Sequence, residues 1–129
     1  MKSHTIKQDD LTQNHILENQ LNYCMTFLSH AQTINTPSIS SYSIKHTIQT
    51  LLESITPPEH RLSCYISDRA VELAAEYMNI PCRNGDVALS TPWYDHIERQ
   101  RCDIVTLSEL RSREFNSLDE AILFCQTRL

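Results

Sequence analysis

The sequence predicts a mainly α protein, a single domain of four to five helices with one short two-stranded β element. Apolar residues recur at helical spacing in several segments, and proline or Ser/Thr/Asp residues stand at the ends of those segments. Gly85 is the only glycine in 129 residues, which leaves few positions for hairpin turns. The length corresponds to one domain with its own core. We expect residues 1–8 to be a flexible tail and residues 9–129 to be the helical domain.

The first half of the chain predicts two helices. Asp9 or Asp10 caps a helix over about residues 10–32, which carries Leu17, Leu21, Cys24 and Leu28 as one apolar stripe and Ile16, Tyr23 and Phe27 as a second. Ser40 or Ser41 begins the next helix, and Pro57-Pro58 follows its end at Ile55. Leu62, Cys64 and Ile66 then alternate with other residues, as in a short strand over residues 62–66.

The second half predicts the remaining elements. Ser67 caps a helix that extends to about Asn79, and residues 83–86 (Arg-Asn-Gly-Asp) form a turn that uses positive φ. Thr91-Pro92 begins a helix that extends to about Cys102, and residues 103–107 form a brief strand. Ser117 and Glu120 are in the register of a capping box for the last helix.

Composition and spacing exclude several classes of function. With one glycine there is no phosphate-binding glycine loop, no dinucleotide fingerprint and no G-x-S-x-G nucleophile turn, so the sequence predicts no cofactor. The five cysteines form no C-x-x-C pair, and no close pair of Cys and His ligands matches a zinc site, so we expect no metal. No apolar segment approaches membrane-spanning length. The absence of a signal-peptide pattern and the odd cysteine count predict a cytoplasmic location.

One helix face carries the polar groups that we expect to bind a partner. At 100° per residue, Tyr42 and His46 lie one turn apart on the side opposite the Ile44/Ile48 stripe, with Lys45 beside them. Trp93 and Tyr94, next to a helix start, are a second candidate binding pair because aromatic residues often anchor interfaces. For both sets, packing within the protein is the competing interpretation, and for Trp93 it is the one that we favour.

Two segments resemble a group of small uncharacterised bacterial and phage mobile-element proteins. Residues 40–46 match the pattern S-S-Y-x-[L/I]-K-H, and residues 65–67 match the start of a later Y-[I/V]-S-N segment. The resemblance covers residues 33–80. It departs at Asp68, where Asn is usual, and in the longer spacer over residues 53–64. It implies an accessory protein of a bacterium or phage, and it implies no activity.

The sequence therefore favours a small acidic, non-enzymatic protein that binds another macromolecule, namely a protein. The net charge of −5 and the absence of a basic stripe argue against nucleic acid. Two alternatives stay open. One is a DNA-binding regulator with a variant helix-turn-helix, in which an eleven-residue connection over residues 56–66 replaces the usual short turn. The other is a cysteine/histidine-dependent enzyme that uses Cys64 or Cys82 with His46.

Overall fold

The computed structural model describes residues 8–111 and 115–128, and the side chains of residues 17–102 and 115–128 apart from those of residues 58 and 61. The elements, in chain order, are α1 (Gln8–His30), β1 (Ile39–Ser40), α2 (Ser41–Ile55), the 3₁₀ helix η1 (Pro58–Cys64), α3 (Asp68–Tyr77), β2 (Cys82–Arg83), β3 (Asp86–Val87), α4 (Thr91–Arg111) and α5 (Leu118–Thr127). The predicted mainly α class is confirmed. Except for Gln8, the predicted tail lies outside the described residues.

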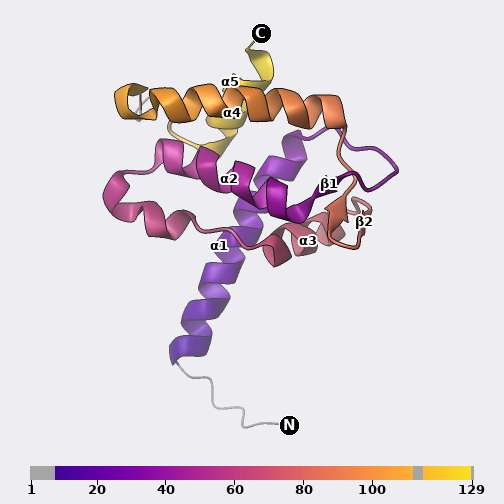
Figure 1. Cartoon of the computed structure of the whole chain (residues 1–129). Coiled ribbons are helices and arrows are strands. Elements are labelled where there is room, and N and C mark those ends of the chain that lie inside the picture. The colour runs from indigo at the N-terminus through magenta and orange to yellow at the C-terminus, as the bar shows by residue number, and fades with distance from the viewer. Residues whose placement is uncertain (1–7, 112–114, 129) are drawn as a thin grey trace.

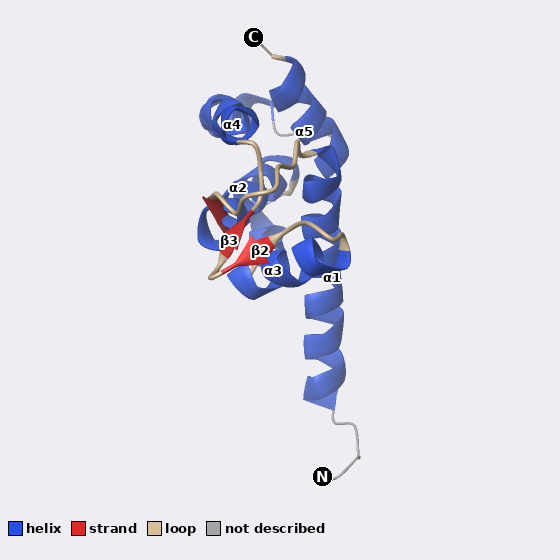
Figure 2. Cartoon of the chain, turned by 90° about the vertical axis from the view of Figure 1, so that its right-hand side faces the viewer, coloured by secondary structure: helices blue, strands red, loops and turns tan. Residues whose placement is uncertain are grey.

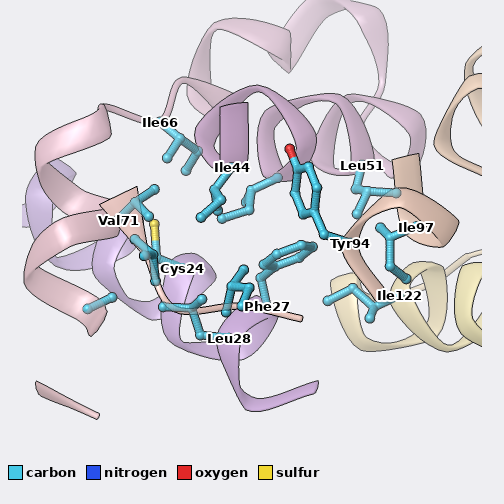
Figure 3. Packing of buried hydrophobic residues seen from close by; sticks show 14 of the residues in the cluster. Cys24, Phe27, Leu28, Ile44, Leu51, Ile66, Val71, Tyr94, Ile97 and Ile122 are labelled. Atoms are coloured by element: carbon cyan, nitrogen blue, oxygen red, sulfur yellow. The ribbon is translucent and has the colours of Figure 1, made fainter. Parts of the chain in front are cut away.

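The helices pack around one apolar core. Helix α2 lies between α4 on one side and α3 on the other, and α1 crosses behind them (Figure 1). Seen from the side, the N-terminal half of α1 extends beyond the other elements (Figure 2). This explains why Cys24 and Leu28 are buried, whereas Leu17 in the same predicted stripe is 37 % exposed. Phe27 and Leu28 of α1 belong to the same buried cluster as Ile44 and Leu51 of α2 (Figure 3).

A small antiparallel sheet closes one end of the molecule. Its strand order is β1-β3-β2, and Ile39 lies opposite Val87 while Arg83 lies opposite Asp86. The β2–β3 hairpin turns at Asn84 and Gly85, whose φ angles are 54° and 80°. Both central residues of a two-residue hairpin turn of type I′ need positive φ, so this is the turn that the single glycine predicts.

Local capping explains where three helices begin. The hydroxyl of Ser40 accepts from the backbone N–H of Ser43, that of Ser67 from Ala70, and that of Ser117 from Glu120. These three predicted starts are confirmed. Helix α4 is capped by Ser90, one residue before the predicted Thr91. Helix α1 already begins at Gln8, so Asp9 and Asp10 lie inside it.

Both predicted strands are wrong. Residues 58–64 form η1, and residues 103–107 continue α4 without a break to Arg111. A Pro-Pro step favours a tight helical turn, since a proline at the first helical position loses no hydrogen bond. The sheet is formed instead by two-residue strands, which are too short to show an alternating pattern in the sequence.

Candidate functional site

Helix α2 presents three polar side chains on its exposed face. Its opposite face is fixed in the core by Ile44, Ile48 and Leu51, each fully buried. On the outer face the rings of Tyr42 and His46 meet edge to face, with centroids 4.5 Å apart. Tyr42 remains 60 % exposed. The predicted juxtaposition within this helix is therefore present in the structure, on a rigid element.

A second segment, distant in sequence, meets this face. The Nζ of Lys45 lies 5.3 Å from the ring centroid of Tyr42 and 5.4 Å from that of Tyr65. Tyr65 is 54 % exposed. Two cation–π contacts of this kind contribute about 0.5–1 kcal/mol each at an exposed site. We call Tyr42, Lys45, His46 and Tyr65 the aromatic–lysine patch.

Backbone hydrogen bonds hold the Tyr65 segment in place. Ile66 is fully buried, and its N–H donates to Oε1 of Gln49 on α2 at 3.2 Å. The N–H of Ser67 donates to Oε1 of the buried Gln20 on α1 at 2.8 Å. Glutamine side chains thus satisfy two backbone donors that have no partner in a helix or sheet. The position of Tyr65 is fixed from two sides.

The sequence interpretation missed Tyr65 and the neighbouring Leu62. A strand would place Leu62, Cys64 and Ile66 on one side. Residues 58–64 form a 3₁₀ helix instead, in which Leu62 and Cys64, two residues apart, point in different directions. The exposed fractions agree, because Leu62 is 95 % exposed while Cys64 is 2 % exposed. Tyr65 lies in the second of the two segments that resemble the mobile-element proteins. That resemblance was the feature of the sequence that could have marked Tyr65 as a candidate.

Trp93 and Tyr94 lie in the core rather than on an exposed surface, which corrects their selection as candidate binding residues. They are 9 % and 5 % exposed. The ring of Trp93 packs edge to face on Phe27 at 5.6 Å. The hydroxyl of Tyr94 lies 2.7 Å from Oγ1 of Thr47. A helix start that faces the core buries its aromatic residues, and the sequence alone did not show which way this helix start faces.

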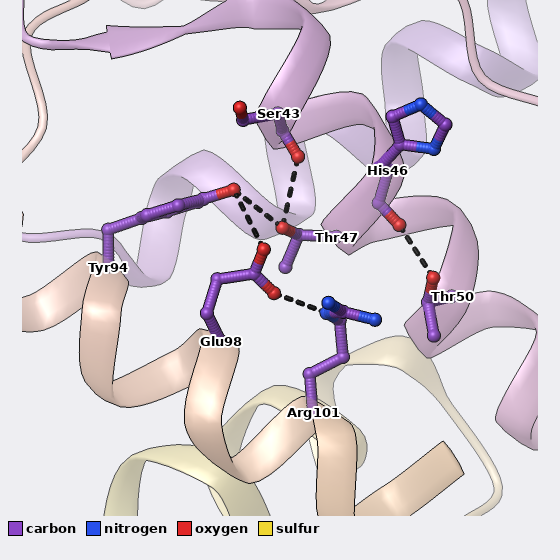
Figure 4. Close-up of polar contacts among 7 residues, drawn as sticks. All are labelled: Ser43, His46, Thr47, Thr50, Tyr94, Glu98 and Arg101. Carbon is purple, nitrogen blue, oxygen red and sulfur yellow. Dashed lines mark hydrogen bonds and ion pairs between the residues drawn. The ribbon is translucent and has the colours of Figure 1, made fainter.

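The buried tyrosine belongs to a polar network between α2 and α4. Its hydroxyl donates to Oε1 of Glu98 at 3.3 Å, and Glu98 also accepts from Nε of Arg101. Burial, above all, raises the pKa of Tyr94. The imidazole of His46 points away from this network (Figure 4). The network therefore joins two helices and has no contact with the aromatic–lysine patch through that ring.

The candidate thiols are poorly placed for nucleophilic chemistry. Of the two candidate nucleophiles, Cys64 is buried and Cys82 is exposed. Cys82 borders a groove of about 590 Å³ between α3 and the β2–β3 hairpin. Partial burial raises the pKa of the Cys82 thiol, and so do the carboxylates of Glu72, Asp86 and Glu76. A nucleophilic cysteine needs the opposite, an electropositive setting that favours the thiolate.

Among the described side chains, His46 makes no hydrogen bond to Cys64 or Cys82. Its ring packs against Tyr42 instead. Within the described side chains, no group of three or more His, Cys, Asp or Glu residues is arranged to hold a metal ion. None of the described helices is both long enough and apolar enough to cross a membrane.

Comparison of the chain with protein-family models, with curated proteins and with solved structures gives no match. The fold defines a mainly α protein with a small three-stranded sheet.

Proposed function

We propose that this protein is a non-enzymatic binding protein that recognises a protein partner through the aromatic–lysine patch. The observation that carries the proposal is the convergence of Tyr42 and Tyr65 on Lys45 from two separate segments. Tyrosine is enriched among the residues that dominate binding energy at protein interfaces. Side chains on a packed helix also lose little conformational freedom when they bind.

The proposal also includes the biological role and the cellular location of the protein. The resemblance of residues 33–80 supports an accessory role in a bacterium or phage, and the absence of paired cysteines supports a cytoplasmic location. The raised pKa of Cys82 and the burial of Cys64 favour binding over thiol catalysis. The carboxylates of Glu72 and Glu76 on α3 disfavour DNA as the partner, because phosphates would be repelled by that helix.

Paired capture experiments test the proposal. The wild type, Tyr42→Ala, Tyr65→Ala and the control Tyr77→Ala are immobilised and exposed to an extract of the native host cell. Tyr77 is a suitable control because it is 71 % exposed and lies outside the patch. We expect one protein to be retained by the wild type and the control and lost from both patch variants, with all melting temperatures within about 2 °C. Equal capture by all four proteins would contradict the proposal.

A further inference from the structure

We infer that Lys45 is the receptor for a carboxylate, and that the partner presents an acidic peptide segment to the aromatic–lysine patch. This inference rests on the proposed function and specifies the chemistry of the partner. It depends on three features. Lys45 has no carboxylate partner in the described part of the chain, hydrogen-bond donors surround it, and the exposed Leu62 precedes Tyr65 by three residues.

Lys45 has no carboxylate partner within the described part of the chain. The ion pairs there join Arg69 to Glu72, Arg101 to Glu98, and His30 to Asp119 when that histidine is protonated. Lys45 instead lies over two tyrosine rings. It is also the only lysine after residue 7 in a chain of net charge −5. An unpaired cation on an acidic protein attracts an anionic group of a partner.

The groups around Lys45 are mainly hydrogen-bond donors. An ammonium group offers three N–H donors, and the hydroxyls of Tyr42 and Tyr65 and the imidazole of His46 can each donate one more. A carboxylate accepts only, through two oxygens, and hydrogen bonds to it from charged donors are stronger than neutral ones. The ammonium group already lies against two rings, which lowers the entropy lost when an anion binds.

Leu62 gives the site an apolar side. It is 95 % exposed and lies in η1, three residues before Tyr65, which directly follows the end of that helix. A leucine so exposed, and so close to Tyr65 in the chain, offers a contact for an apolar side chain of the partner. The segment that fits is therefore an acidic residue next to a large apolar one.

A polynucleotide fits this surface less well. Binding to a phosphate backbone needs several cations along a groove, and the patch has one lysine. A carboxylate needs only the one cation that the patch provides. We therefore choose the acidic peptide, and the test below includes single-stranded DNA as an opposing outcome.

An array of random dodecapeptides tests the inference with defined probes. We expect the wild type to select peptides rich in Asp or Glu beside Leu, Ile or Phe. Lys45→Gln should bind the best such peptide at least about tenfold more weakly, and Lys45→Arg should retain most of the affinity because it keeps the charge. Leu62→Ser should weaken binding about threefold or more while the acidic preference stays. Selection of neutral or basic peptides, no acidic peptide bound, or equal binding by Lys45→Gln would each overturn the inference.

Two further measurements separate this inference from the proposed function. Binding of a single-stranded DNA dodecamer by the wild type, lost in Lys45→Gln, would overturn the peptide assignment. If Tyr42→Ala and Tyr65→Ala lose the captured protein while Lys45→Gln keeps it, the carboxylate site is wrong and the proposed binding surface stands. If none of the three variants loses it, the proposed surface itself is wrong.

Discussion

Replacement of Gly85 by alanine tests whether the single glycine is needed for the hairpin. Gly85 has a φ of +80°, where a residue with a Cβ is strained by about 1–2 kcal/mol. The added Cβ would lie 3.9 Å from Oγ of Ser41 and 4.0 Å from Oε2 of Glu72, which are ordinary contacts. Alanine also restricts the unfolded chain, which offsets about 0.4–1 kcal/mol. The net expected loss in the free energy of unfolding is about 1 kcal/mol.

Urea denaturation followed by circular dichroism measures this loss, which corresponds to about 4 °C in melting temperature. Gly85→Asn is the matched variant, because asparagine tolerates a left-handed backbone better than alanine does. We expect it to lose about half as much stability. The reasoning is refuted if Gly85→Ala is as stable as the wild type or no less stable than Gly85→Asn. The turn also affects the site, since the N–H of Ser41, at the start of α2, donates to the carbonyl oxygen of Gly85 at 2.7 Å.

The remaining predictions concern the packing, the thiols and the position of Tyr65. Tyr94→Phe should lower the free energy of unfolding by about 1 kcal/mol in urea titrations, because it removes the buried hydroxyl; an unchanged midpoint would contradict the network. Burial raises the thiol pKa of Cys24 and Cys125 to about 12 from 9.0. Below pH 9 both states keep these protons, and between pH 9 and 12 only the unfolded chain loses them, so stability should fall by about 1.4 kcal/mol per pH unit per thiol. The double alanine variant should flatten that slope, and an identical slope would refute the assignment. Iodoacetamide should label Cys82 more slowly than free glutathione at pH 7.5, because the raised pKa of Cys82 lowers its thiolate fraction. Faster labelling than glutathione would support the alternative of a thiol enzyme. Gln49→Ala should cost about 1–2 kcal/mol by leaving the N–H of Ile66 without its acceptor, and it should also weaken partner capture; capture at the wild-type level would show that this bond does not position Tyr65.

The candidate site was only partly predictable. Tyr42, Lys45 and His46 share a helix face because helical spacing alone sets their directions, and that could be worked out from the sequence. Tyr65 joins them through contacts between segments nineteen or more residues apart in the chain, which no local spacing encodes. A strand would place Leu62 and Cys64 on one side, but the structure exposes Leu62 and buries Cys64, because these residues belong to a 3₁₀ helix with a period of three rather than two. Whether Trp93 and Tyr94 are exposed could not be decided from the sequence, because it depends on the side of α4 that meets Phe27 and Thr47.

The sequence by itself determined the elements with local causes. The capping hydroxyls of Ser40, Ser67 and Ser117 bond to N–H groups three residues ahead, and the positive φ at Gly85 is a property of that residue. Tertiary structure decided which strands pair and which side chains remain exposed. It also brought Tyr65 to Lys45, because the next residue, Ile66, is buried and bonded to Gln49 of α2, while Ser67 is bonded to Gln20 of α1. Such contacts depend on the summed packing of the whole chain, whereas a cap depends on four consecutive residues.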